Sequence, residues 1–129
     1  MSDTDLNKAA INKFFIDGIG NADMGVIAAL LSPNYQYNGA ASSVADNQAW
    51  VTGLHKSCPG LVMSIEQILA EDDLVALRWR MDVPANGPTK AQFATATNIL
   101  TMIGGQALSN IQTPGSPVLT PVTPSLSPA

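Results

Sequence analysis

The N-terminal half of the chain carries hydrophobic residues at the three- and four-residue spacing that is typical of amphipathic helices. Leu6, Ala10 and Phe14 lie four residues apart, and this face predicts a first helix over residues 5–19. Glycines follow directly, where helices commonly end. The opening segment is therefore expected to pack one helical face against a core.

Two further helices are expected in the first half of the chain. The second follows Asn21 and ends at Ser32-Pro33, because proline disfavours helical backbone in the residue before it. The third begins at Asp46, whose side chain can cap a helix, and is broken by Cys58-Pro59-Gly60. The apolar side of the second helix is formed by Met24, Ile27, Ala28 and Leu31.

After Gly60 the hydrophobic pattern changes to the alternation expected of β-strands. Acidic residues at 71–73 and the pair Gly104-Gly105 mark tight turns between these strands. The predicted strands span residues 35–38, 61–70, 74–83, 90–103 and 106–112. Helices followed by an antiparallel meander are typical of the α+β class, so we expect one α+β domain over residues 1–112.

Residues 113–129 differ from the rest of the chain in composition. They hold five prolines and no charged or aromatic side chain. Such a segment cannot bury enough apolar surface to offset its own ordering entropy. We expect it to be either a disordered C-terminal tail or an extended arm that lies on a partner.

Composition and charge exclude several classes of function. Hydrophobic residues make up 46% of the chain and charged residues only 12%, about half of the usual charged share. Apolar surface must therefore be hidden in a core, a pocket or an interface. The net charge is −4 and the six Lys and Arg residues are spread out, which argues against a nucleic-acid partner. A single cysteine and a single histidine argue against a disulfide and a zinc site, so we expect no metal and no cofactor.

The sequence also predicts the location of the protein. It contains no apolar run of the roughly 18 residues that span a membrane, so no membrane association is expected. Residues 1–5 are acidic and lack the pattern of a signal peptide. We therefore expect a cytoplasmic protein.

Three short motifs follow one another in a recognisable order. They are Pro33-Asn34-Tyr35-Gln36-Tyr37-Asn38, Pro59-Gly60-Leu61 and the predicted hairpin over residues 65–79. Together they resemble the SnoaL-like group of the nuclear-transport-factor-2-like superfamily, over about residues 5–112. The resemblance implies a cone-shaped, curved antiparallel sheet wrapped around three N-terminal helices, with a deep pocket for a small ligand. It also implies a homodimer joined through the outer face of the sheet.

One further motif suggests a chemistry within that superfamily. Arg80-Met81-Asp82 looks like the Arg-x-Asp of limonene-epoxide hydrolase. This resemblance implies that Asp82 is a catalytic proton donor and that Arg80 orients it and stabilises developing negative charge. Asn38 stands at the position of an asparagine that positions water, whereas Gln36 and Gln112 stand where a tyrosine and a second aspartate are found. We therefore expect Asn38 and Gln36 to hold water or a substrate oxygen.

The facing of the strand over residues 74–83 decides whether this motif forms a site, and two alternatives remain open. Arg80 and Asp82 alternate with Leu77, Trp79 and Met81 along the strand. The resemblance implies that the charged residues enter the pocket and that the apolar ones form an outer dimer face. Periodicity alone favours the reverse, with the charged residues in solvent and the apolar ones in the core.

A similar choice arises in the short strand over residues 35–38. If Asn38 and Gln36 face the pocket, Tyr35 and Tyr37 face the opposite side, and a shift of one residue exchanges the two pairs. Strand parity alone therefore leaves the pocket side of this strand open, and the resemblance favours Asn38.

Four other residues are candidates for the site. Trp50 on the third helix and Asn98 in the strand over residues 90–103 are expected to contact a ligand. Glu66 and His55 follow Asp82 as candidates for acid–base chemistry.

These observations support two functions. The first is a cofactor-independent acid–base enzyme that acts on a small, oxygenated hydrophobic molecule, through polyketide or terpenoid cyclisation, isomerisation or epoxide opening. The alternative is a non-catalytic module for small-molecule binding or dimerisation. No Asp or Glu follows Asp82 in the chain, so apart from Lys90 the last two predicted strands hold only amides and hydroxyls as polar groups. Because neutral amides cannot take up a proton at neutral pH, the alternative stays open.

Overall fold

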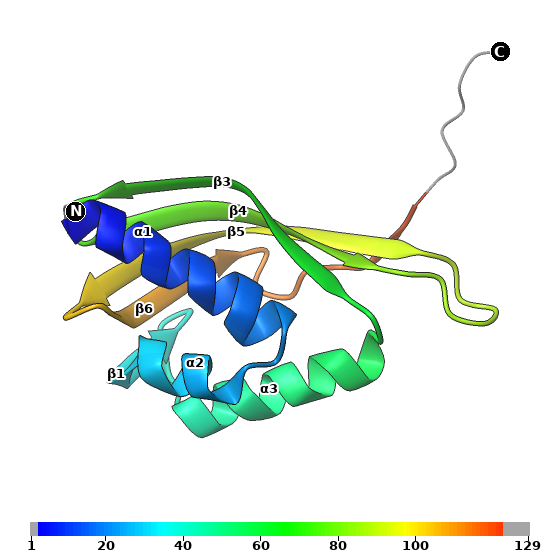
Figure 1. Cartoon of the computed structure of the whole chain (residues 1–129), viewed down its shortest axis with the longest axis horizontal. Coiled ribbons are helices and arrows are strands. Elements are labelled where there is room, and N and C mark those ends of the chain that lie inside the picture. The colour runs from blue at the N-terminus through cyan, green and yellow to red at the C-terminus, as the bar shows by residue number, and fades with distance from the viewer. Residues whose placement is uncertain (1–2, 123–129) are drawn as a thin grey trace, which may run out of the picture.

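Three helical segments lie against one face of a curved sheet in the computed structural model, which describes residues 3–122 (Figure 1). The helices are α1 (Asp3–Lys13), continued by the π-helical segment η1 (Phe14–Gly20), α2 (Met24–Leu30) and α3 (Val44–Ser57). The strands are β1 (Leu31–Tyr37), β2 (Ala40–Ala41), β3 (Val62–Glu71), β4 (Leu74–Val83), β5 (Gln92–Ile103), β6 (Gln106–Thr113) and β7 (Thr120–Pro121). The predicted α+β class is confirmed.

The sheet has the strand order β2-β1-β6-β5-β4-β3, and β7 pairs with β5. Strands β3 to β6 form the antiparallel meander that the sequence predicts. β1 pairs with β6 in parallel, so the sheet is mixed at this edge, where the resemblance implied an antiparallel sheet. The reason is that α3 and the three strands of the meander lie between β1 and β6, and this long connection returns β6 in the direction of β1.

Capping groups, rather than the hydrophobic pattern, set the helix boundaries. Asp23 caps α2 and Ser43 caps α3, each through a side-chain oxygen that accepts a backbone N–H of the first turn. Because Ser43 is the cap instead of Asp46, α3 begins earlier than predicted. Leu31, predicted as part of the second helix, already has extended backbone and begins β1.

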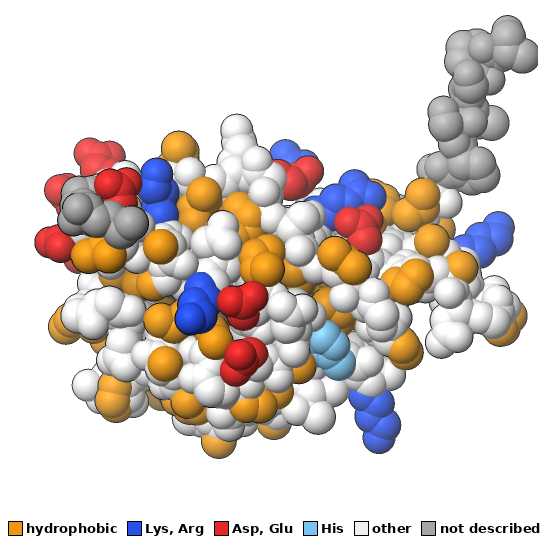
Figure 2. Space-filling model, in the orientation of Figure 1, with side chains coloured by type: hydrophobic (Ala, Val, Ile, Leu, Met, Phe, Trp, Pro, Cys, Tyr) orange, Lys and Arg blue, Asp and Glu red, His pale blue; other side chains and the backbone are white. Residues whose placement is uncertain are grey.

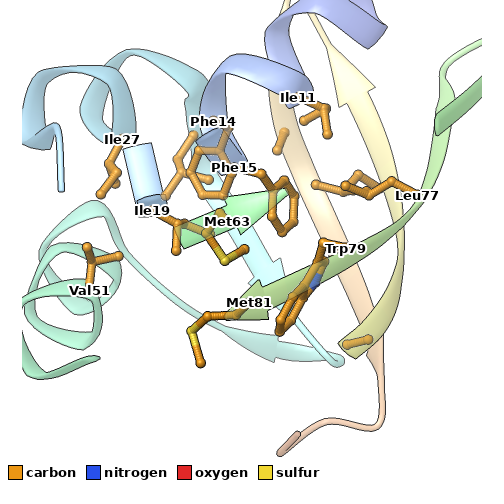
Figure 3. Close-up of a cluster of buried hydrophobic side chains, with 14 of the residues drawn as sticks. Ile11, Phe14, Phe15, Ile19, Ile27, Val51, Met63, Leu77, Trp79 and Met81 are labelled. Atoms are coloured by element: carbon orange, nitrogen blue, oxygen red, sulfur yellow. The ribbon is translucent and has the colours of Figure 1, made fainter. Parts of the chain in front are cut away.

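The core lies between the helices and the concave face of the sheet (Figure 3). Phe14 and Phe15 of η1 meet edge to face, with ring centroids 5.5 Å apart. A Cβ at Gly20 would lie 3.2 Å from Met63 Cβ, so the glycine lets the end of η1 approach β3 closely. η1 therefore holds the helices against the sheet at this contact.

Burial decides the facing of β4. Leu77, Trp79 and Met81 are at most 5% exposed and project toward the helices (Figure 3). Arg80 and Asp82 alternate with them and lie on the convex face. The expectation that Leu77, Trp79 and Met81 form an outer dimer face is therefore wrong, as is the expectation that the charged residues point inward. The helices cover the concave side, and apolar side chains gain most free energy there.

The C-terminal segment continues along the domain past residue 112. β7 pairs with Gln92 and Phe93 of β5, and the N–H of Val122 donates to the carbonyl oxygen of Ala91 at 2.9 Å. The part of the predicted tail that the structure describes thus lies along the domain itself. Residues 123–129 of that tail lie outside the described residues.

The surface agrees with the low content of charged residues. Figure 2 shows one face on which Lys, Arg, Asp and Glu side chains are sparse among hydrophobic and neutral ones. Between residues 3 and 122, none of the helices has the length and apolar character needed to cross a membrane. The cytoplasmic location stays a prediction.

Candidate ligand-binding pocket

A cavity of about 560 Å³ lies between α3 and the concave face of the sheet. Its wall is built by η1, α3, strands β1 and β3 to β6, and residues 115–117 and 119. Aromatic and aliphatic side chains such as Phe15, Leu54, Trp79 and Met81 make up most of this wall. The volume falls within the range of small-molecule sites.

A chain of buried amides runs behind and along this wall and starts at Trp79. The indole N–H of Trp79 donates to Asn98 Oδ1 at 2.7 Å. Asn98 Nδ2 then donates to Asn110 Oδ1 at 2.8 Å and to Gln112 Oε1 at 3.2 Å. Asn98 is fully buried and lies behind the wall, which Trp79, Asn110 and Gln112 line. Asn98 was predicted to contact a ligand, but it contacts residues that line the cavity instead.

The indole sets the direction of this network, because a tryptophan N–H can only donate. Asn98 must turn its oxygen toward Trp79 and its NH₂ group toward Asn110 and Gln112, which accept through their own oxygens. The NH₂ groups of Asn110 and Gln112 are then left to donate in other directions. The amides of the wall consequently suit an acceptor oxygen.

These donors already have partners within the protein. The side chain of Asn110 hydrogen-bonds the phenol of Tyr35. Gln112 Nε2 donates to the carbonyl oxygens of Pro114 and Gly115, at 3.3 Å each. The O–H of Tyr37 donates to the same Gly115 oxygen at 3.1 Å. Two donors from different strands thus converge on one backbone carbonyl.

Burial makes the phenols and the thiol of the cavity weaker acids. It raises the pKa of Tyr35 to about 12, and the hydrogen bond to Asn110 only partly offsets this rise. Burial likewise raises the pKa of Tyr37 and the pKa of the Cys58 thiol. All three groups are neutral near pH 7, so they add no charge to the wall.

Asp46 supplies the one carboxylate that lines the cavity within residues 3–122. It lies in the first turn of α3, at the exposed rim, near Trp50. Trp50, predicted to contact a ligand, does line the cavity and is 51% exposed. Over the described part of the chain, no three His, Cys, Asp or Glu side chains are grouped so that they could hold a metal ion.

Arg80 and Asp82 pair with each other away from the cavity. Arg80 Nε lies 3.0 Å from Asp82 Oδ1, and both side chains are partly exposed. The Arg80 guanidinium also stacks over the ring of Phe93, 4.3 Å from its centre. Because β4 sends alternate side chains to opposite faces, neither residue lines the cavity. The two predicted catalytic residues therefore do not contact a molecule that binds there.

In β1 the tyrosines, and not Gln36 and Asn38, face the cavity. Tyr35 and Tyr37 line the cavity, whereas Gln36 is exposed on the other side. Asn38 follows the strand with left-handed backbone (φ 48°), and its Oδ1 accepts the backbone N–H of Gln112 at 2.7 Å. The placement of Asn38 and Gln36 in the pocket is thus corrected: Asn38 ties the end of β1 to β6, and Gln36 faces outward.

The remaining acid–base candidates, His55 and Glu66, have structural partners, and neither lines the cavity. His55 Nε2 lies 2.7 Å from the carbonyl oxygen of Ile19. Glu66 pairs with Arg78 at 3.0 Å on the exposed side of the sheet. Neither arrangement brings an acid or a base to the cavity.

Sequence reasoning missed Tyr35, Tyr37 and Asn110, and it missed the polar role of Trp79. One signal could have found them. A buried tryptophan usually needs an acceptor for its N–H, and Asn98 lies one strand away. Amides at inward positions of two apolar strands indicate a network, since buried polar groups are nearly always hydrogen-bonded.

Comparison with known proteins agrees with this fold. The family model described as the SnoaL-like domain matches residues 12–109. The chain therefore belongs to the SnoaL-like domain family. No match was found among curated proteins.

Several solved structures share the fold. A candidate polyketide cyclase from Acidithiobacillus ferrooxidans is 16% identical, with a TM-score of 0.72, and the match covers 87% of this chain and 89% of that one. AclR, a candidate hydroxylase from Streptomyces galilaeus, is 18% identical, with a TM-score of 0.71 and coverage of 96% and 92%. A candidate ketosteroid isomerase from Kribbella flavida is 18% identical, with a TM-score of 0.64 and coverage of 87% and 79%. At such identities the likeness establishes the fold alone.

The buried phenol of Tyr35 predicts a loss of stability at high pH. A tyrosine in the unfolded chain ionises near pH 10, whereas folded Tyr35 keeps its proton to about pH 12. Within this window the folded state binds more protons, so the free energy of unfolding falls as pH rises, by up to about 2–3 kcal/mol. Urea unfolding at about pH 9 and about pH 11 measures the fall. Tyr35→Phe should show a smaller one, and an equal fall in both proteins would contradict the prediction.

Proposed function

We propose that this protein binds a small, neutral, oxygenated hydrophobic molecule in the cavity beneath α3. The observation that carries the proposal is a cavity of about 560 Å³ whose wall is mainly apolar and whose buried polar groups are amides and phenols. Such a wall favours an apolar ligand, since burying apolar surface is favourable. Among the described residues, no Lys, Arg or His lines the cavity, so an anionic ligand would lose its water without a cationic partner.

The proposal predicts a preference for neutral ligands. 2-Acetylnaphthalene should bind at least about tenfold more tightly than 2-naphthoate, which has the same rings, because the carboxylate would be desolvated without a cationic partner. Isothermal titration calorimetry measures both affinities. Equal binding of the carboxylate would contradict the proposal.

A cavity-filling variant locates the binding. Ala94 lines the cavity, so Ala94→Phe should place a ring inside it and abolish binding. Thr97→Phe, on the opposite face of β5, is the matched control and should bind as the wild type does. Unchanged binding by a folded Ala94→Phe protein would place the ligand elsewhere.

A second candidate function is cofactor-independent cyclisation or isomerisation. It is favoured by Asp46, whose carboxylate borders the cavity and could take a proton from a carbon next to a bound carbonyl. The resemblance noted in the sequence implied instead that Asp82 donates a proton and that Arg80 orients it. Their position on the convex face limits them to a molecule bound on that side.

The enzyme candidate predicts isomerisation of 5-androstene-3,17-dione, followed by the absorbance of the conjugated product. Asp46→Asn should lower kcat by about a hundredfold, since the base is lost, while the affinity for 2-acetylnaphthalene stays the same. Asp82→Asn is the matched control and should keep full turnover. Loss of turnover in Asp82→Asn alone would return the chemistry to the convex pair, and no turnover by the wild type would count against this candidate.

We also propose that two copies of the chain associate through the convex face. Leu69, Ala76, Ile99 and Ile111 are successive cross-strand partners on β3, β4, β5 and β6, and they form an apolar row on that face. Leu69 is 71% exposed, and Ile99 and Ile111 are about half exposed. An apolar row of this kind is commonly covered by a partner.

A charge in that row should prevent the association. Ile111→Asp should be a monomer at micromolar concentration, while the wild type is a dimer, because a carboxylate would lose water in the interface. Light scattering measures the mass of both. Val118→Asp, at an exposed position on the C-terminal segment, is the control and should remain dimeric. A monomeric wild type would refute the proposal.

A further inference from the structure

Residues 114–119, which we call the strap, lie across the cavity between β6 and β7. Gly115, Ser116, Pro117 and Leu119 line the cavity from this side. The far end of the strap is held by β7, which pairs with β5. The near end is held by side chains that line the cavity. The far anchor is therefore strand pairing, whereas the near anchor is made by side-chain hydrogen bonds.

The near anchor uses two donors of the cavity wall. Tyr37 O–H donates to the Gly115 carbonyl oxygen at 3.1 Å, and Gln112 Nε2 donates to the same oxygen at 3.3 Å. The two side chains come from β1 and β6, and both line the cavity. A backbone carbonyl therefore occupies the point at which the wall presents two neutral donors to one acceptor.

Gln112 cannot reverse its amide to present an acceptor there. Its Oε1 accepts from Asn98 Nδ2 at 3.2 Å, and the oxygen of Asn98 is committed to the N–H of Trp79. Reversal would set two NH₂ groups against each other in the interior, which costs the desolvation of unpaired donors. The preference of this point for an acceptor oxygen is thus a property of the wall and does not depend on the strap.

We propose that the Gly115 carbonyl oxygen occupies the position of a ligand oxygen, and that the ligand is a neutral carbonyl compound, such as a ketone or a quinone. The oxygen of this ligand accepts the hydrogen bonds of Tyr37 and Gln112 in place of Gly115 and so displaces the strap. The inference rests on the proposed binding function and adds the functional group and the gate. Hydrogen bonds are exchanged nearly one for one, so the exchange itself changes the free energy little. Displacement then costs the contacts of the strap, which burial of the ligand offsets.

A hydrocarbon of the same shape should behave differently. It cannot accept a hydrogen bond, so opening the strap would leave Tyr37 and Gln112 without their partner. It should therefore bind beneath a closed strap. Ketone and hydrocarbon thus differ in whether the strap moves, and this difference can be measured.

Gly115 offers a way to weaken the strap without changing either donor. A Cβ at Gly115 would lie 3.0 Å from Asn38 Nδ2, so Gly115→Val should push the strap away from β1. Val118 lies on the same strap and is 77% exposed. Val118→Ala is therefore the matched control, because it changes the strap without changing its anchor.

The test uses the full-length chain with 2-acetylnaphthalene and its carbon isostere 2-isopropenylnaphthalene. Gly115→Val should bind the ketone about three- to tenfold more tightly than the wild type, because a weakened anchor no longer competes for the donors. Its affinity for the hydrocarbon, and both affinities of Val118→Ala, should change by less than about twofold. No gain for the ketone, or equal gains for both molecules, would overturn the inference.

A double-mutant cycle tests the shared donor. In the wild type, Tyr37→Phe should change ketone affinity by less than about twofold, because strap and ketone lose the same hydrogen bond. In the Gly115→Val background, the same change should weaken the ketone about three- to tenfold, since the strap no longer uses the donor. Equal effects in both backgrounds would overturn the inference.

Hydrogen exchange reports on the strap directly. The ketone should speed exchange at the strap residues that have an amide hydrogen, which are Gly115, Ser116, Val118 and Leu119. The hydrocarbon should leave this exchange unchanged or slow it. Slower exchange with the ketone would mean that it binds beneath a closed strap, and the inference would fail while the binding function stood. If neither molecule bound to the wild type, the binding function would fail and the inference with it.

Discussion

The hydrogen bond from the Trp79 indole to Asn98 Oδ1 sets the chemistry of the whole cavity. It links β4 to β5 on the concave face, and because an indole N–H can only donate, it fixes which way Asn98 points. Asn98 then fixes the amides of Asn110 and Gln112, which present donors rather than acceptors. Trp79 thus packs its ring in the core and, through one N–H, gives direction to polar groups on two further strands.

The fold allows these amides to be buried with their hydrogen bonds satisfied. The sheet curves around the helices, and the contact of Gly20 with Met63 holds η1 close to β3. α3 lies farther along the sheet, where space remains for a cavity. Within residues 3–122, no buried side-chain nitrogen or oxygen lacks a hydrogen-bond partner, so the amides avoid the desolvation cost of unpaired polar groups. The cavity wall is polar where these amides and the two phenols lie and mainly apolar elsewhere.

The charged pair and the cavity lie on opposite faces of the sheet, whereas the family resemblance implied that the pair enters the pocket. The Arg80–Asp82 pair lies on the convex face and stacks on Phe93, whereas the cavity is served by neutral groups and by Asp46 at its rim. A SnoaL-like domain can therefore keep its fold while its polar groups take up different roles. The neutral donors of Tyr37 and Gln112 also hold the strap, since both donate to the Gly115 carbonyl oxygen.

The sequence by itself determined the order of helices and strands, because hydrophobic period and glycine or proline breaks are local properties. It also showed that residues 79 and 80 face opposite ways, but alternation carries no sign, so only the helices covering one side of the sheet decided which residue faces the cavity. The same one-residue ambiguity hid Tyr35. The parallel pairing of β1 with β6, the path of the strap and the link from Trp79 to Gln112 join residues far apart in the chain. Such contacts depend on strand register and long-range packing, for which no local pattern exists.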